Sequence, residues 1–320
     1  MITLSDLRTA QKRLENITIR TKLIPFPLCA EDLRLLLLKP ENQQPIGAFK
    51  LRGAYNKIAA LSEDERKKGV ISYSSGNHAQ GVAYAARALK TKSVIVMPNN
   101  APQIKREATA KLGAEIVLVG PGSEERKTKA EELAAHHGYI IVPPYNDEHI
   151  IAGQGTIGLE ILEELPEVET VLSPVGGGGL ISGVAAAIKL TNPKVKVIGV
   201  EPELAADAQA SLRQGKIVQF PAEQVSRTFA DGLRTQSIGP INFEHIRAYV
   251  DDIITVNEDE IRKAMKYLSA NPQTVAEPSG AVATAGFIFH AKDLPQSEVN
   301  VAIISGGNIE PAMLEELRRS

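Results

Sequence analysis

Short apolar runs rich in β-branched residues alternate along the chain with longer segments whose apolar residues recur at helical spacing. Continuous apolar strands that alternate with helices are typical of parallel sheets covered on both faces. The pattern therefore predicts the α/β fold class, built on open parallel sheets. The expected strands are 69–73, 93–97, 115–118, 139–142, 170–174, 196–200, 252–256 and 299–305, and the expected helices are 79–89, 101–112, 123–137, 154–165, 180–190, 258–270 and 281–292.

Composition narrows the class of protein. With 320 residues the chain is long for one hydrophobic core, so we expect two domains. The net charge is −2 and basic blocks are absent, which argues against nucleic acid and anionic membranes as partners. Cys29 is the only cysteine, so no intramolecular disulfide can form. The N-terminus lacks the basic and apolar regions of a signal peptide, so we expect a cytoplasmic protein.

Four consecutive glycines, Gly176, Gly177, Gly178 and Gly179, separate one expected strand from the next expected helix. Such a run costs backbone entropy and is useful where the backbone must approach a ligand closely. The amide groups of such a loop and the positive end of the helix dipole both favour an anion. The run therefore predicts a phosphate-binding loop.

Lys50 stands after a turn, at the start of another helical segment that opens with small and apolar residues. A lysine in that position is usually solvated surface. A lysine that is partly desolvated near a helix N-terminus has a lowered pKa, however, and a Schiff-base amine requires this. Lys50 is therefore a candidate nucleophile.

Three further segments lie at the ends of expected strands, where ligands bind in open parallel sheets. The segment 74–78 is either a helix cap with a turn glycine or a group of small donors for a carboxylate. Ser305 belongs either to a plain turn or to a hydroxyl site facing a ring. Glu201 and Asp207 are either helix caps or ligands of a hard cation, together with carbonyls between them.

The segment Gly153–Gly158 fits the dinucleotide pattern G-x-G-x-x-G. The residues before it do not form an expected strand, and no strand ending in Asp or Glu lies about 20 residues further on. We therefore interpret the segment as the entry to a helix, which makes a nicotinamide oxidoreductase a weak alternative.

The chain resembles the fold type II pyridoxal-phosphate enzymes, in the branch of serine/threonine dehydratases and serine racemases. The resemblance lies in the order and the separations of Lys50, the segment 74–78, the glycine run and Ser305. The resemblance extends from about Leu4 to Pro311. It implies a tryptophan synthase β-like fold, with a large domain of residues 1–68 and 147–320, a small substrate-side domain of residues 69–146, and the cofactor between them. It also implies a homodimer and no C-terminal regulatory domain.

The resemblance also implies a role for each matching residue. Lys50 would hold pyridoxal phosphate covalently and move the substrate's α-proton, and Ser75 is a second catalytic candidate on the opposite face. Phe49 would lie beside the ring, Asn77 would bind its phenolic oxygen, Gly176 to Gly179 its phosphate, and Ser305 its pyridine nitrogen. The substrate carboxylate would meet Ser74, Ser75, Gly76, Asn77 and His78, and a divalent cation, Mg²⁺ or Ca²⁺, would meet Glu201, the Ala205 carbonyl and Asp207.

Four positions depart from the family pattern or differ within it. Ala48 stands where the family usually has a serine, two residues before the lysine, and Tyr145 replaces an asparagine or phenylalanine beside the ring. Ser75 matches the acid/base of racemases, although some dehydratases also carry it. Arg126 resembles an arginine near the substrate in racemases and 3-hydroxyaspartate dehydratases, or is a solvated helix residue.

The expected reaction is elimination of water from L-serine, L-threonine or another β-hydroxy amino acid, which yields a 2-oxo acid and ammonia. One alternative is a serine racemase with side dehydratase activity, and another is a 3-hydroxyaspartate dehydratase. The remote alternative is a non-catalytic protein that binds a phosphate ligand.

Overall fold

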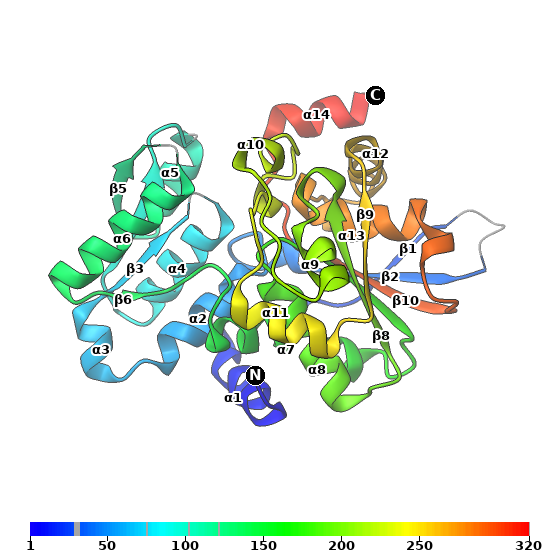
Figure 1. Cartoon of the computed structure of the whole chain (residues 1–320), viewed down its shortest axis with the longest axis horizontal. Coiled ribbons are helices and arrows are strands. Elements are labelled where there is room, and N and C mark those ends of the chain that lie inside the picture. The colour runs from blue at the N-terminus through cyan, green and yellow to red at the C-terminus, as the bar shows by residue number, and fades with distance from the viewer. Residues whose placement is uncertain (29–32, 75, 102, 121, 320) are drawn as a thin grey trace.

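The computed structural model describes residues 1–28, 33–74, 76–101, 103–120 and 122–319. Within these residues the strands form two sheets, which lie on opposite sides of the molecule in Figure 1. The larger sheet has the order β1-β2-β10-β7-β8-β9 and the smaller the order β5-β4-β3-β6. The strands are β1 Ile24–Phe26, β2 Leu35–Pro40, β3 Val70–Tyr73, β4 Ser93–Pro98, β5 Glu115–Val119, β6 Ile140–Ile141, β7 Thr170–Pro174, β8 Lys196–Pro202, β9 Asp252–Val256 and β10 Val299–Ile304.

Helices connect these strands and cover the sheets. The α/β class expected from the sequence is confirmed, and no helix in the described ranges has the length and apolarity needed to cross a bilayer. The α-helices are α1 Leu4–Leu14, α2 Lys50–Ala60, α3 Glu63–Lys68, α4 Asn77–Ala88, α5 Gln103–Lys111, α6 Ser123–His137, α7 Glu148–Glu164, α8 Gly179–Thr191, α9 Asp207–Gln214, α10 Ala222–Val225, α11 Pro240–Tyr249, α12 Glu258–Leu268, α13 Pro278–Phe289 and α14 Pro311–Arg319.

The larger sheet is mixed, so the expectation of wholly parallel sheets is wrong at one edge. Strand β1, which the sequence did not predict, runs antiparallel to β2, whereas β2, β10, β7, β8 and β9 are parallel. Strand β10 pairs with β2 on one side and with β7 on the other. The segments that follow these three strands therefore come together at one edge of the sheet.

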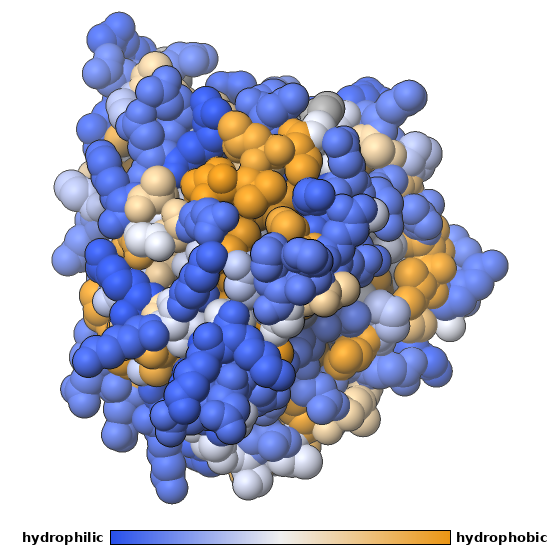
Figure 2. Space-filling view, turned by 90° about the vertical axis from the view of Figure 1, so that its left-hand side faces the viewer, coloured by the Kyte–Doolittle hydropathy of each residue, from blue (hydrophilic) through white to orange (hydrophobic). Residues whose placement is uncertain are grey.

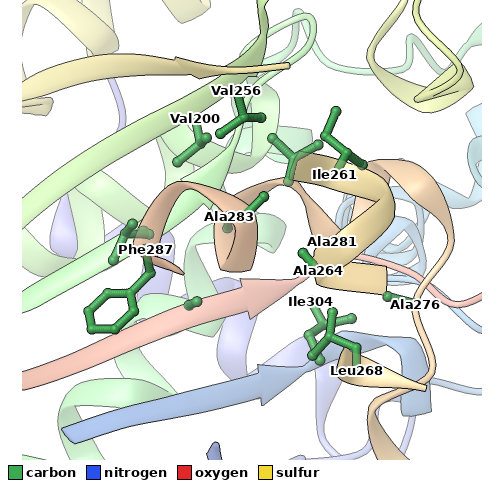
Figure 3. Packing of buried hydrophobic residues seen from close by; sticks show 14 of the residues in the cluster. Val200, Val256, Ile261, Ala264, Leu268, Ala276, Ala281, Ala283, Phe287 and Ile304 are labelled. Carbon is green, nitrogen blue, oxygen red and sulfur yellow. The ribbon is translucent and has the colours of Figure 1, made fainter. Parts of the chain in front are cut away.

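Strand periodicity gives the larger sheet a core on each face. Ala302 and Ile304 of β10 point into one apolar cluster, and Val301 and Ile303 point into another. Helix α13 covers the first face, where Figure 3 shows Phe287 and its neighbours packed against the strands. Helices α7 and α8 cover the second.

The smaller sheet is wholly parallel and follows the same rule. Ile95 and Met97 of β4 pack with α4, whereas Val94 and Val96 pack with α6 on the other face. Figure 2 shows that this side of the molecule is mostly hydrophilic, with a large apolar area and smaller apolar patches among the hydrophilic residues. The polar surface agrees with the many charged residues of α6.

The G-x-G-x-x-G segment lies inside α7 rather than at a helix entry, so that interpretation is wrong. The helix begins at Glu148, and its N-cap Asp147 accepts the amides of His149 and Ile150. A Cβ on Gly153 would lie 2.6 Å from the Cα of Gly53 in α2. These glycines therefore let neighbouring helices approach α7 closely.

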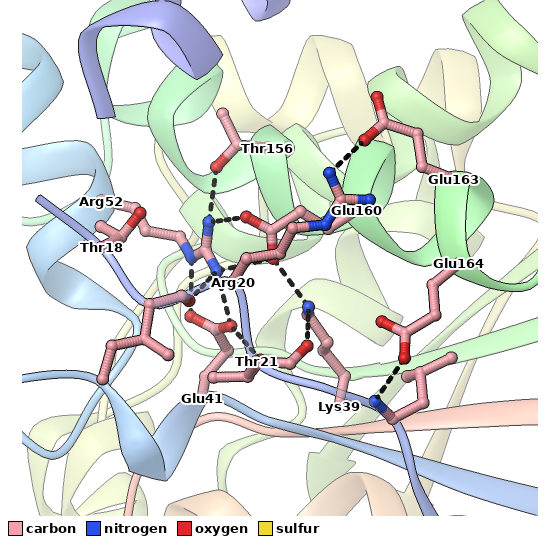
Figure 4. Close-up of polar contacts among 12 residues, drawn as sticks. Thr18, Arg20, Thr21, Lys39, Glu41, Arg52, Thr156, Glu160, Glu163 and Glu164 are labelled. Atoms are coloured by element: carbon pink, nitrogen blue, oxygen red, sulfur yellow. Dashed lines mark hydrogen bonds and ion pairs between the residues drawn. The ribbon is translucent and has the colours of Figure 1, made fainter. Parts of the chain in front are cut away.

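A buried network of charges holds α2 against α7 and the turn after β2 (Figure 4). Arg52, which is fully buried, donates to both oxygens of Glu41 at 2.7 and 2.8 Å and to both oxygens of Glu160 at 2.6 and 2.9 Å. Lys39, equally buried, donates to Glu160 at 2.7 Å. The network fixes the first turn of α2, which carries Lys50.

Candidate active site

A cavity of about 540 Å³ lies where segments from both sheets meet. Residues that follow β3, β7 and β10 line it, together with the start of α2. Most of the site residues expected from the sequence line this cavity: Phe49, Lys50, Ser74, Gly76, Asn77, His78, Arg126, Gly176, Gly177, Gly178, Gly179 and Ser305. Ser75 lies outside the described residues.

The start of α2 is tied to the end of β10. Gly47 has φ +72°, the left-handed conformation that favours glycine, and this turns the chain into the helix. The amide of Phe49 then donates to the Ser305 carbonyl at 3.0 Å, and Ala48 pairs with Gly306. Lys50 and Ser305 therefore reach one cavity although they are far apart in sequence.

Lys50 sits at the first position of α2 with part of its surface open to the cavity. Its Nζ donates to the carbonyl of Pro144 at 2.8 Å. Desolvation by the surrounding protein lowers the pKa of Lys50 to about 8. The lysine is thus the partly desolvated amine that the sequence predicted.

The glycine run forms the connection from β7 to α8. Gly178 has φ +93°, and a Cβ there would lie 2.9 Å from the Cβ of Asn242. A Cβ on Gly179 would lie 2.9 Å from the Cβ of Tyr145, which also lines the cavity. The first amides of α8 have no acceptor within the helix, so the loop and helix end offer N–H donors to an anion.

The segment after β3 places a second helix N-terminus at the cavity, since α4 begins at Asn77. The side chain of His78 is buried, with Nε2 3.1 Å from the Val142 carbonyl. Burial, assisted by the charge of Lys50, lowers the pKa of His78 to about 3. His78 is therefore neutral, and what it can offer a carboxylate is its backbone amide.

Ser305 is 4% exposed, and its hydroxyl lies 3.4 Å from the Ser279 carbonyl. A hydroxyl adds no charge to the cavity, unlike a carboxylate at the same place. Its proton and lone pairs remain suited to a ring nitrogen.

The cation ligands expected from the sequence form a separate buried group. Glu201, at the end of β8, accepts the amides of Ala208 and Gln209 at 3.0 and 2.8 Å. Neither carboxylate oxygen of Asp207 makes a hydrogen bond within the described part of the chain. Burial raises the pKa of Asp207 to about 7, and burial and the charge of Asp207 raise that of Glu201. Two buried carboxylates thus lie together, with Ala205 buried nearby in the chain.

The sequence missed several charged residues of the cavity. Glu277, just before α13, lines it and is buried. Lys105 of α5 and Asp231 also line it and form an ion pair at 2.8 Å. Arg126, which the sequence did propose, also lines the cavity, and burial lowers its pKa. An acidic residue before a Pro-Ser-Gly helix start was the one sequence signal available for Glu277.

Comparison with known proteins gives concordant matches. A family model described as pyridoxal-phosphate dependent enzyme matches residues 14–306. The chain is 47% identical over 318 residues to the L-threonine ammonia-lyase of Thermotoga maritima, covering 99% of this chain and 78% of that protein. It is 40% identical over 309 residues to the L-threo-3-hydroxyaspartate ammonia-lyase of Saccharomyces cerevisiae, covering 96% and 94%. The structure of maize serine racemase matches with a TM-score of 0.93 at 36% identity, covering 98% of this chain and 95% of that one.

The chain therefore belongs to the family of pyridoxal-phosphate dependent enzymes. The resemblance stated from the sequence is confirmed, and pyridoxal phosphate is the cofactor that the family implies. The cavity fits this cofactor, since it combines an amine of lowered pKa with a loop of amide donors.

Proposed function

We propose that this enzyme is an ammonia-lyase for a β-hydroxy amino acid, with L-threonine and L-serine as its substrates. The observation that carries the proposal is the position of Lys50, a desolvated amine in the same cavity as the glycine loop and Ser305. The L-threonine ammonia-lyase at 47% identity supports the substrate class.

Each residue of the cavity takes one role in the proposal. Gly176 to Gly179 would bind the phosphate through their amides and Phe49 would contact the ring. Asn77 would bind the phenolic oxygen, and Ser305 would bind the ring nitrogen. The bound cofactor would supply an electron sink for negative charge that develops at the substrate α-carbon. The amides and hydroxyls at the start of α4 orient the substrate carboxylate.

Lys50 binds the cofactor and transfers the α-proton. With a pKa of about 8, about a tenth of the Lys50 amine is neutral at pH 7, several hundred times the fraction expected at a pKa of 10.5. Because burial lowers the pKa of His78 to about 3, its imidazole is too weak a base to compete with Lys50.

Borohydride reduction followed by peptide mass spectrometry tests the role of Lys50. We expect the cofactor mass on the peptide that contains Lys50 and its loss in Lys50→Ala. Lys57→Ala is the matched control, because Lys57 lies on the same helix but pairs with Asp147. Label on another lysine, or no label in the wild-type protein, would refute the assignment.

A panel of L-serine, D-serine, L-threonine, both 3-hydroxyaspartates and phenylserine tests the reaction. We expect a 2-oxo acid and ammonia from L-threonine and L-serine. D-serine formed from L-serine without pyruvate would instead establish the racemase alternative, in which Ser75 is the second acid/base. Ser75→Ala should then abolish D-serine formation.

A second candidate substrate is 3-hydroxyaspartate, favoured by Arg126 on the cavity wall, since the extra carboxylate of this substrate requires a cation. The yeast hydroxyaspartate ammonia-lyase, at 40% identity, supports this candidate. Arg126→Gln should then reduce kcat/KM for 3-hydroxyaspartate at least tenfold while L-threonine changes little. Arg213→Gln, an exposed arginine outside the cavity, is the control. Equal effects on both substrates would refute this role.

We further propose that Glu201, the Ala205 carbonyl and Asp207 bind a divalent cation. The unpaired oxygens of the buried Asp207 support it, because paired buried carboxylates are costly unless a cation or a proton compensates them. Mg²⁺ or Ca²⁺ at 100 times its Kd should add about 2.7 kcal/mol to the free energy of unfolding. Addition of EDTA should lower Tm, and Asp207→Asn should remove the response. An EDTA-insensitive Tm would indicate a shared proton instead.

We also propose a domain organisation and an assembly for the protein. Residues 69–146 form a small substrate-side domain around the four-stranded sheet, and residues 1–68 and 147–320 form a large one. The protein acts as a homodimer in the cytoplasm. Light scattering and limited proteolysis would test the assembly and the domain boundaries.

A further inference from the structure

Glu277 is a buried carboxylate at the cavity that the proposed chemistry does not use. It is 6% exposed and lies directly before α13. Burial and the nearby charge of Asp231 raise the pKa of Glu277 to about 7, against the opposing effects of Asn77 and Lys105. Lys105 itself is paired with Asp231 at 2.8 Å. Glu277 is thus a buried carboxylate in the cavity wall that forms no ion pair of its own among the described residues. A group in this environment is a candidate for a functional role.

The closest partner of Glu277 is the side chain of Asn77. Asn77 Nδ2 donates to Glu277 Oε1 at 2.6 Å, a short distance that is typical of a charge-assisted hydrogen bond. A carboxylate only accepts hydrogen bonds, so it selects the nitrogen end of the amide and not the oxygen end. Glu277 thereby favours the orientation of the Asn77 amide in which Nδ2 faces the carboxylate.

A second contact fixes the other end of the same amide. Asn308 Nδ2 donates to Asn77 Oδ1 at 2.7 Å and to the carbonyl of Ile46 at 2.9 Å. The oxygen of Asn77 is thus occupied, and one N–H of its Nδ2 is used by Glu277. The second N–H of Nδ2 remains for a ligand in the cavity that Asn77 and Glu277 both line.

We propose that Glu277 is a positioning residue, which holds the Asn77 amide so that its second N–H meets the phenolic oxygen of pyridoxal phosphate. This inference rests on the proposed role of Asn77 at the cofactor. Without the carboxylate, only the hydrogen bond from Asn308 would hold the Asn77 amide, so its nitrogen end would be less firmly oriented. Glu277 therefore acts on the cofactor through Asn77.

Cofactor affinity measures this role independently of turnover. Purified holoenzymes are dialysed against graded concentrations of pyridoxal phosphate, and the bound fraction gives Kd. Glu277→Ala should raise Kd about fivefold to tenfold, since one hydrogen bond is lost. Glu277→Gln, whose amide oxygen still accepts from Asn77, should stay within about twofold of the wild-type Kd. Glu258→Ala is the control, because this half-buried carboxylate accepts the Phe229 amide outside the cavity.

A double-mutant cycle separates positioning from a general structural role. In an Asn77→Ala background, Glu277→Ala should not raise Kd further, because the amide that it positions is absent. If Glu277→Ala does not fold, Glu277→Asp replaces it, since the shorter side chain keeps the charge but withdraws from Asn77.

The outcomes distinguish this role from the proposed function. An unchanged Kd in Glu277→Ala would overturn the role of Glu277 but not the proposed function. The same holds if the fold-changes in Kd of Asn77→Ala and Glu277→Ala multiply in the double variant. A wild-type protein that binds no pyridoxal phosphate would overturn both that role and the proposed function.

Discussion

Replacing Arg52 with methionine should strongly destabilise the protein, because it removes the cation from the buried network of Figure 4. Arg52 makes hydrogen bonds to Glu41, Glu160, Thr156 and the Ile19 carbonyl. In the variant, Glu160 would keep Lys39 at 2.7 Å, but Glu41 would retain only neutral donors, Thr21 at 3.2 Å and Gln44 at 3.3 Å.

The structure sets the size of this loss. Breaking a buried ion pair from one side costs about 3–5 kcal/mol, because the remaining charge is uncompensated. Methionine fills part of the volume of arginine, so a cavity adds little to the cost. Arg20→Met is the matched control, since Arg20 pairs with Glu163 at 2.9 Å but is half exposed. A surface pair of this kind contributes about 0–1 kcal/mol.

The pH dependence gives a second check on the same reasoning. Burial by itself raises the pKa of Glu160, but the charges of Arg52 and Lys39 outweigh it and hold this pKa below its ordinary value. A lowered pKa contributes stability above the pKa of the unfolded state, about 4.3, and this contribution is lost as the pH falls through the folded value. The difference between wild type and Arg52→Met should therefore be largest near neutral pH and shrink below about pH 4.

Urea unfolding of the holoenzymes, followed by far-UV circular dichroism at several pH values, measures the effect. The expected result is a large loss at pH 7 for Arg52→Met and a small one for Arg20→Met. A loss below about 1 kcal/mol in Arg52→Met, or one that does not change with pH, would show that the network is not a coupled buried charge cluster.

Two further predictions concern packing and charge elsewhere. Gly153→Ala places a Cβ 2.6 Å from the Cα of Gly53, so α2 and α7 must separate. We expect the free energy of unfolding in urea to fall by about 1–3 kcal/mol. An unchanged urea midpoint would contradict this close contact. Partial burial by itself lowers the pKa of His290, but hydrogen bonds to Asp293 and Glu260 outweigh it and raise this pKa. The stability that His290 contributes should therefore be full below about pH 6 and decline as the pH rises through its folded pKa, and His290→Gln should show no such decline in Tm.

The local pattern of the chain was sufficient to predict most of the strands and helices. All eight expected strands occur with ends within two residues of the prediction, because each is a short apolar run bounded by turn residues. Strand β2 was missed, since Leu35 to Leu38 contain no β-branched residue and leucine favours helix by propensity. The run becomes a strand because β1 and β10 pair with it on both sides.

Glycines show where local pattern misleads. The run Gly176–Gly179 was predicted as a loop, and its first three glycines connect β7 to α8, which begins at Gly179. The glycines of 153–158 satisfied a loop motif, yet they lie within α7. The glycines of α7 serve helix packing, since Gly153 faces Gly53 on another helix. Gly53 is distant from Gly153 in the sequence, so the residues around α7 give no sign of this contact.

The sequence by itself predicted the candidate site residues, because Lys50, Asn77, the glycine run and Ser305 together resemble the pattern of one family. The tertiary structure alone decided what surrounds them. Glu277 meets Asn77 across 200 residues of sequence. The lowered pKa of Lys50 likewise depends on desolvation by segments that are distant in the chain. Burial and long-range contact arise only when the chain folds, so no local pattern contains them.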